Sequence, residues 1–314
     1  MRASLKKSKG KMQLQQTLKK DYLFEGKGLH TGKVARMKVC PAPVDTGIVF
    51  KRTDIGEEAF VEALAENVSN TARSTTIAKG NASVSTIEHI LSALTGMGVD
   101  NALIEIDNVE VPILDGSAKP YIDAMWADGF QQQDAPRRYV ELKETVEIRN
   151  DEKGSVVRIE PAEEFSYDIL VDFNSRVLGV QNARWDSAVV YPEEIGVCRT
   201  FVFFHEIEFL FNNGLVKGGD VDNAIVIVEH PVTDEQVNNM SRLFNVPALK
   251  VREDGYLSNL QLRFNNECAR HKLLDLIGDL RLCGGFLKAK ITAEKAGHGI
   301  NTTAAKAVRN LINE

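Results

Sequence analysis

Apolar residues recur along the chain with two different periods, which predicts a protein of mixed α and β structure. Runs in which every second residue is apolar, bounded by Gly, Pro or Asn, indicate strands. Apolar residues three and four positions apart indicate helices. The predicted strands are 35–40, 48–51, 101–106, 140–148, 156–161 and 286–293, and the predicted helices are 85–97, 120–127, 233–245, 266–284 and 302–312.

The order of these elements suggests that the second half of the chain repeats the strand-then-helix order of the first half. Polar residues and a proline interrupt the pattern at 131–138, where we place a domain boundary. The sequence Met-Lys-Val-Cys-Pro-Ala at 37–42 has a counterpart, Val-Arg-Ile-Glu-Pro-Ala, at 157–162. We therefore predict an α+β fold with two similar domains, 13–134 and 135–314, preceded by a disordered basic tail at 1–12.

The predicted helix 266–284 carries an unusual polar stripe. His271, Asp275 and Asp279 are spaced four apart, so at about 100° per residue they share one face. Leucine and isoleucine flank this face on both sides, which indicates that the stripe is buried. Buried imidazoles and carboxylates are paired, hydrogen-bonded or bound to a metal. The His-x-x-x-Asp spacing suits two ligands of one ion, although a simple hydrogen-bonded pair has the same spacing.

Length, charge and cysteine content exclude several classes of protein. The chain has 314 residues, enough for two domains, and its net charge of −6 argues against a nucleic-acid partner. No stretch approaches the length of apolar sequence that crosses a membrane. The four cysteines form no CxxC motif, which suits reduced thiols and favours a cytoplasmic location.

Three further positions could complete a catalytic centre. His89 is the best candidate for a third metal ligand, because it follows an acid in Thr-Ile-Glu-His. Glu88 could be a general base, but Ser85-Thr-Ile-Glu88 is also a capping-box pattern in which Glu88 only caps a helix. His298 lies between two glycines, which suits either a proton donor or an ordinary surface turn.

Two other stretches allow competing interpretations. Five of the fourteen phenylalanines fall within 201–211, which favours core packing or an apolar sleeve for a long-chain ligand. The glycine-rich segment 26–33 superficially suggests a phosphate loop. It has no Ser or Thr after the lysine and is one residue too long for a Walker motif, so we reject that interpretation.

Together these motifs resemble the zinc-dependent UDP-3-O-acyl-N-acetylglucosamine deacetylases of bacterial lipid A synthesis. The resemblance extends from about residue 13 to the C-terminus, with the motifs in family order. The matching stretches are Thr-Ile-Glu-His-Ile-Leu-Ser-Ala-Leu at 86–94, Val-Pro-Ile-Leu-Asp-Gly-Ser-Ala at 111–118, Cys-Arg-Thr-Phe at 198–201, Gly-Gly-Asp-Val-Asp-Asn-Ala-Ile-Val at 218–226, Arg-His-Lys-Leu-Leu-Asp-Leu-Ile-Gly-Asp at 270–279 and Gly-His-Gly-Ile-Asn at 297–301.

The resemblance implies a role for each site residue and an active site between the helix layers of the two domains. It implies hydrolysis of the N-acetyl group of UDP-3-O-(3-hydroxyacyl)-N-acetylglucosamine to acetate and the free amine. The implied roles are Zn²⁺ ligands for His89, His271 and Asp275, general base for Glu88, proton donor for His298, oxyanion stabilisation for Thr200, orientation and charging of His298 for Asp279, a catalytic and substrate-contacting cation for Lys272, and substrate contacts for Phe201, Gly218 and Gly219, with the acyl chain in a hydrophobic passage around 200–225.

The chain also departs from the compact members of the family. The segment 231–264 is longer and is similar to members in which a 3-hydroxyacyl-carrier-protein dehydratase is fused after the deacetylase. Ser74 and Thr75 stand where many members carry a cysteine near the metal. A sugar- or nucleotide-binding module with a structural metal is the main competing hypothesis, and it would require a fourth protein ligand. A small-molecule kinase would need a phosphate loop that the sequence does not contain.

Overall fold

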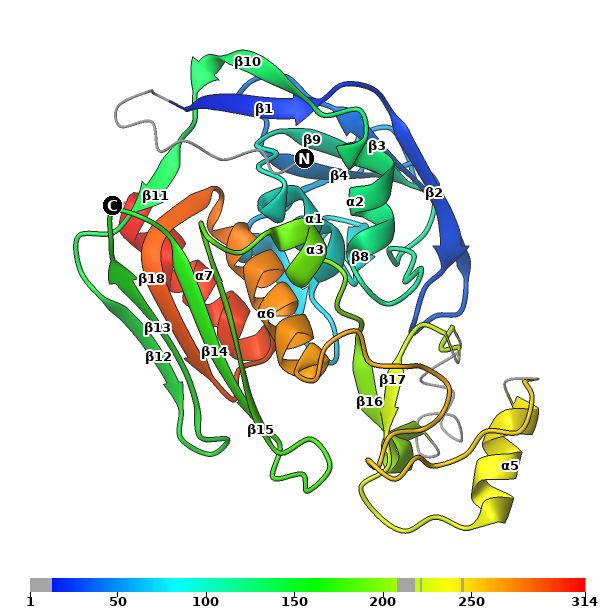
Figure 1. Cartoon of the computed structure of the whole chain (residues 1–314). Helices are drawn as coiled ribbons and strands as arrows, with labels where there is room; N and C mark the ends of the chain where they lie inside the picture. The colour runs from blue at the N-terminus through cyan, green and yellow to red at the C-terminus, as the bar shows by residue number, and fades with distance from the viewer. Residues whose placement is uncertain (1–12, 208–217, 221, 244–245, 314) are drawn as a thin grey trace.

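The computed structural model describes residues 13–207, 218–220, 222–243 and 246–313 (Figure 1). The fold class is α+β, as predicted. Two mixed β-sheets lie on opposite sides of a central group of helices, in which α1 packs against α6. Buried apolar residues form one continuous core that runs from the first sheet through these helices to the second.

The first sheet is formed by the N-terminal half of the chain. Its strands, in spatial order, are β2 (Tyr22–Lys27), β3 (Val34–Pro41), β9 (Ala102–Ile106), β4 (Ile48–Arg52) and β5 (Phe60–Glu62). The same half contains β1 (Leu14–Leu18), β6 (Val68–Asn70), β7 (Thr76–Lys79), β8 (Ala82–Ser85), β10 (Phe130–Pro136), the 3-10 helix η1 (Ala65–Asn67), α1 (Glu88–Gly96) and α2 (Lys119–Trp126).

The second sheet is formed by the C-terminal half. Its strands, in spatial order, are β12 (Val146–Asn150), β13 (Ser155–Pro161), β18 (Phe286–Glu294), β14 (Ser166–Asp172) and β15 (Val180–Asp186), with β11 (Tyr139–Glu141) parallel to β18. The helices are α3 (Tyr191–Glu194), α6 (Glu267–Leu280), the 3-10 helix η2 (Arg281–Cys283) and α7 (His298–Asn313).

The two sheets share one topology. In the first, β3 pairs antiparallel with β9, which runs parallel to β4. In the second, β13 pairs antiparallel with β18, which runs parallel to β14. Pro41 and Pro161, the matching prolines of the sequence echo, end β3 and β13. The echo therefore coincides with a repeated order of strands.

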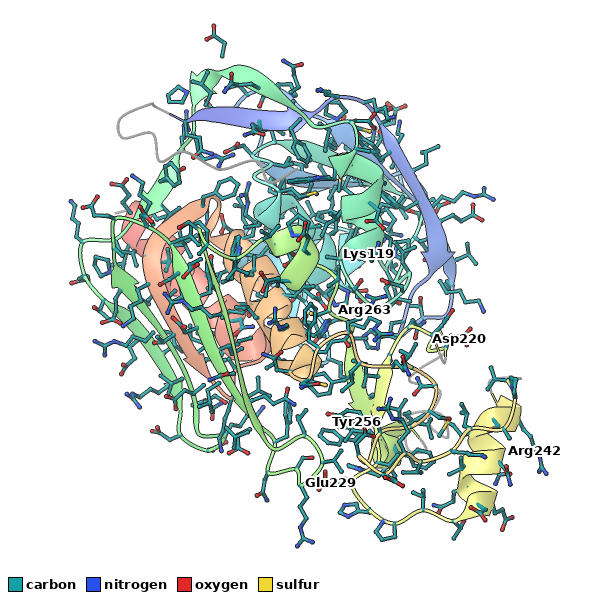
Figure 2. All side chains as sticks on the ribbon, viewed as in Figure 1. Lys119, Asp220, Glu229, Arg242, Tyr256 and Arg263 are labelled. Atoms are coloured by element: carbon teal, nitrogen blue, oxygen red, sulfur yellow. The ribbon has the colours of Figure 1, made fainter. Side chains whose placement is uncertain are left out.

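A smaller unit extends from the second half (Figure 1). It contains β16 (Phe201–Phe203), its parallel partner β17 (Ile225–Ile227), and α5 (Asp234–Leu243). It has its own small apolar cluster, and Figure 2 shows Tyr256 and Arg242 on this unit. Residues 208–217 and 221 of the predicted passage, among them Phe209 and Phe211, lie outside the described residues, as does the tail 1–12.

Three sequence predictions were wrong in detail. The interruption at 131–138 overlaps β10, which pairs antiparallel with β1; its mostly polar residues suit a two-stranded ribbon with little burial. The predicted strand 140–148 is two strands, because β11 pairs with β18 and β12 with β13. The last helix begins at His298, four residues earlier than predicted. The position of the domain boundary stays a prediction.

Among the described residues, no helix combines the length and apolar character needed to cross a membrane.

Candidate metal centre and active site

The site is built where α1 and α6 cross at very short range. A Cβ atom on Gly278 of α6 would lie 2.0 Å from the carbonyl oxygen of Glu88, so only glycine allows this approach. The first turn of α1 is thereby held against the polar stripe of α6. Two helices from different halves of the chain thus contribute to one cluster of side chains.

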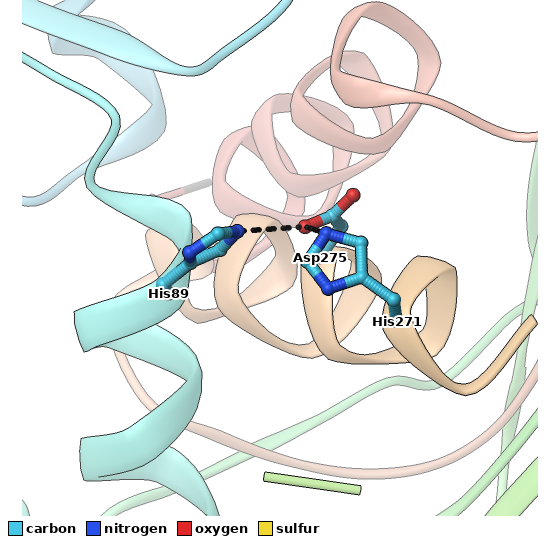
Figure 3. Close-up of side chains that lie close together, drawn as sticks. All are labelled: His89, His271 and Asp275. Carbon is cyan, nitrogen blue, oxygen red and sulfur yellow. Dashed lines mark ion pairs between the residues drawn. The ribbon is translucent and has the colours of Figure 1, made fainter. Parts of the chain in front are cut away.

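The polar stripe is buried, as its apolar flanks predicted. His271, Asp275 and Asp279 are 1%, 2% and 0% exposed. His89 joins them from α1, and one ligand atom from each of His89, His271 and Asp275 lies within 4.8 Å of the others. Figure 3 shows both imidazoles directed at Asp275, with Nε2 of His89 and of His271 at 3.6 and 3.4 Å from its Oδ1.

The chemistry of these three residues fits a divalent metal ion. Oδ1 of Asp275 is buried and accepts no hydrogen bond from any described residue, and an ionised oxygen buried without a partner is costly. Nδ1 of His271 lies 3.1 Å from the carbonyl oxygen of Cys198, and donation there leaves the Nε2 lone pair free to coordinate. Two imidazoles and one carboxylate form a typical open zinc site.

Electrostatics keep two of the candidate ligands, His271 and Asp275, in the protonation states that metal binding needs. Burial lowers the pKa of His271 to about 3, so its imidazole is neutral. Burial opposes the charge of Asp275, but Lys272, with Nζ 2.9 Å from Oδ2, helps to hold the pKa of that carboxyl well below its usual range. The site therefore presents a neutral imidazole and an ionised carboxylate at neutral pH.

Glu88 is not the helix cap that the capping-box pattern allowed. Its Oε2 accepts a hydrogen bond from the backbone N–H of Thr75 at 3.0 Å, and the N-terminal cap residue of α1 is Ile87. Ser85 instead donates its hydroxyl to the carbonyl of Val109. The reason is Thr86, whose φ of 60° turns the backbone before the helix begins. Burial raises the pKa of Glu88.

The buried Asp279 and the partly buried His298 form a second pair beside the three candidate ligands. His298 Nδ1 lies 3.0 Å from Oδ2 of Asp279. Asn301 donates to the same oxygen at 3.0 Å, and the hydroxyl of Thr75 donates to the other at 2.5 Å. Burial opposes a charge on His298, but the carboxylates of Asp279 and Glu88 outweigh it and raise its pKa to about 9. His298 is therefore an imidazolium at neutral pH.

One cavity of about 400 Å³ connects most of the predicted residues. Phe201 forms part of its wall, with the Lys272 ammonium 5.7 Å from the ring centroid. Gly219 lines the cavity, whereas Gly218 packs against the backbone of Gly28 and does not. The predicted residues that line the cavity are Glu88, His89, Thr200, Phe201, Gly219, His271, Lys272, Asp275 and His298.

Part of the cavity wall is apolar, and an open basic hollow adjoins the cavity. Val202, Ile207 and Leu257 line the apolar part. The hollow, of about 480 Å³, shares Lys272 and His298 with the cavity and adds Arg149, Lys153 and Lys295.

Comparison with known proteins identifies the chain's relatives. Residues 15–244 and 242–310 match the family described as UDP-3-O-acyl N-acetylglycosamine deacetylase (LpxC). The chain belongs to this family. It is 40% identical over 290 residues to the UDP-3-O-acyl-N-acetylglucosamine deacetylase of Teredinibacter turnerae, which covers 91% of this chain and 87% of that protein.

Other relatives of the deacetylase family are longer. The bifunctional enzyme LpxC/FabZ of Porphyromonas gingivalis is 42% identical over 303 residues, covering 96% of this chain and 66% of the relative. The corresponding enzyme of Bacteroides thetaiotaomicron is 40% identical over 298 residues, covering 95% of this chain and 65% of the relative. The chain thus spans slightly less than two thirds of the length of these bifunctional proteins.

Sequence reasoning missed two members of the cluster. Thr75 bonds both Glu88 and Asp279, although 204 residues separate it from Asp279. Asn301 bonds Asp279 from the first turns of α7. Both positions lie in stretches named in the sequence analysis, 297–301 and the pair 74–75, but neither stretch indicated what Asn301 or Thr75 contacts.

Proposed function

We propose that the chain is a zinc-dependent amidohydrolase that removes the N-acetyl group of UDP-3-O-(3-hydroxyacyl)-N-acetylglucosamine, the committed step of lipid A synthesis. One observation carries the proposal: Oδ1 of Asp275, which accepts no hydrogen bond from the described residues, faces two imidazole nitrogens in a cavity that Glu88 and His298 also line. With three protein ligands in the described chain, the group suits a catalytic site better than a closed structural one.

His89, His271 and Asp275 would hold the metal. A bound Zn²⁺ would supply a nucleophilic water near neutral pH and a Lewis acid for the amide carbonyl. Glu88 would take the proton from the attacking water, and the Thr75 N–H keeps its carboxylate in place.

The remaining residues would stabilise the tetrahedral intermediate and help it to break down to the amine and acetate. Thr200 would stabilise the oxyanion. His298, held charged beside Asp279, would protonate the departing glucosamine nitrogen, because an amine is a poor leaving group until it gains a proton. Asp279 would orient the imidazolium through Nδ1 and leave Nε2–H for the substrate.

The cavity and the adjoining hollow support this substrate class. The apolar wall suits the 3-hydroxyacyl chain, and Phe201 suits the face of the sugar ring. The basic hollow suits the diphosphate of UDP, with Lys272 shared between the two spaces. Gly219 gives the substrate close access to the backbone at the cavity wall.

The resemblance to fused members further supports a 3-hydroxyacyl-carrier-protein dehydratase as a covalently linked partner in the whole protein. The four cysteines of the chain form no disulfide, which suits action of this protein in the reducing cytoplasm.

Mass spectrometry of the reaction products tests the proposed function. The purified chain should release acetate from UDP-3-O-(3-hydroxyacyl)-N-acetylglucosamine and leave an amine that retains UDP and the acyl chain. UDP-N-acetylglucosamine without the acyl chain is the matched control and should react far more slowly. Absence of acetate release from the acylated substrate, with zinc present, would contradict the proposal.

A further inference from the structure

The glycine-rich segment 26–33, rejected above as a phosphate loop, does bind an anion, and that anion belongs to the protein. The backbone N–H groups of His30 and Thr31 both donate to the carboxylate of Glu110, at 2.9 Å to Oε1 and 2.8 Å to Oε2. Two successive N–H groups of this kind form an anion-binding nest. The nest is filled by a side chain, which excludes a phosphate from the same position.

Glu110 is bound on its other side to the turn that precedes the candidate catalytic helix. Its Oε1 also accepts the hydroxyl of Thr86 at 3.0 Å. Thr86 has a φ of 60° and stands two residues before Glu88. The carboxylate is 1% exposed, so its charge depends on these three bonds for stabilisation.

The segment held by Glu110 forms part of the cavity wall. Leu29 and His30 line the cavity, as does Thr86 on the other side of the carboxylate. The carbonyl of Leu29 accepts the N–H of Gly218 at 3.1 Å, and Gly219 and Asp220 continue the wall. The Glu110 carboxylate thus binds two segments of the cavity wall directly, the loop at His30 and the turn at Thr86. It is linked to a third segment, which begins at Gly218, through the backbone bond of Leu29.

The close fit around the carboxylate shows why the loop needs glycine. A Cβ atom on Gly28 would lie 2.3 Å from Oε2 of Glu110, inside the contact distance of the two atoms. The glycines of the loop therefore make room for the carboxylate of Glu110 and not for a ligand from solution.

We infer that Glu110 is a positioning residue for the substrate: it binds the loop 28–32 to Thr86 and so sets the shape of the cavity at Leu29 and His30. This inference rests on the proposed function. Because Glu110 contacts none of the three candidate metal ligands, its loss should weaken substrate binding more than it slows the chemical step.

Glu110→Gln tests the inference, because it keeps the size of the side chain and replaces one acceptor oxygen by an NH₂ group that faces backbone donors. We expect unchanged zinc content, a KM raised about tenfold and kcat within about threefold of wild type. Deuterium exchange in peptides covering 28–33 should be faster. Glu105→Gln is the control, since Glu105 forms a surface pair with Lys38 at 2.7 Å, and it should behave as wild type.

Glu110→Asp keeps the carboxylate on a side chain that is one carbon shorter. It should raise KM and speed deuterium exchange at 28–33, each by less than Glu110→Gln does. Unchanged exchange at 28–33, or faster exchange with wild-type KM, would contradict the inference. Unfolding of both variants would show a role in stability alone and would also contradict it. A wild-type chain with no turnover would instead overturn the proposed function, while the exchange measurement would still report whether Glu110 holds the loop.

Discussion

At the level of single residues, Asp275 and Glu88 lie in one cavity but should respond differently to removal of the carboxylate. Asp275→Ala takes away one of three ligands and should reduce zinc affinity by more than about 100-fold, with loss of activity. Glu88→Gln keeps all three ligands and should retain zinc while kcat falls by about 10²- to 10⁴-fold. Metal analysis together with kinetics checks both variants; an active, zinc-replete Asp275→Ala would show that Asp275 is not a ligand.

His298 should set the alkaline limit of activity. Asp279 and Glu88, helped by Asp275, raise its pKa to about 9 against the effect of burial. Lys272 in the cavity and Lys295 in the adjoining hollow are cations that line the same spaces as His298. Because the protonated form is the proposed proton donor, activity should be retained through neutral pH and fall as the pH rises through about 9.

Asp279→Asn removes the nearest carboxylate and should move this alkaline limb down by about 1 to 2 pH units. The pH profile of kcat measures the shift. Asp168→Asn, at a surface pair with Arg184, is the control and should leave the profile unchanged. A limb that stays in place in Asp279→Asn would show that another group titrates.

At the level of the helices, the contact between α1 and α6 decides whether the ligands meet. Gly278→Ala would place a methyl group 2.0 Å from the Glu88 carbonyl, so the two helices must separate. We expect a loss of about 1 to 3 kcal/mol in the free energy of unfolding together with weaker zinc binding. Thermal denaturation and metal titration measure the two effects. The control is Gly154→Ala, at an open turn with φ of 61°, which should cost stability through backbone strain without changing zinc affinity.

The same helices show which parts of the site were accessible to sequence reasoning. The spacing of His271, Asp275 and Asp279 depends only on helix geometry, so the buried stripe was predicted correctly. Glu88 could not be assigned from its local pattern, because the φ of Thr86 and the distant N–H of Thr75 decide what it contacts. The hydrogen bonds of Glu110 join it to a loop about 80 residues earlier in the chain, and a local sequence pattern cannot indicate such a contact.

At the level of the whole molecule, the repeated order of strands explains why the site lies between two halves. Each half supplies one sheet and its own helices, and α1 and α6 meet at the junction. The short sequence echo around Pro41 and Pro161 indicated this repeat. The spacing of apolar residues, in contrast, could not predict that β10 pairs with β1 or that β11 pairs with β18. Such pairings depend on which strands the rest of the fold leaves exposed.

Zinc titration of the metal-free chain tests the central claim most directly. The chain is stripped with a chelator, and deacetylation of UDP-3-O-(3-hydroxyacyl)-N-acetylglucosamine is measured as zinc is returned. We expect negligible activity without metal and complete recovery at one zinc per chain. Activity that survives complete removal of metal, or that zinc does not restore to a folded chain, would contradict it.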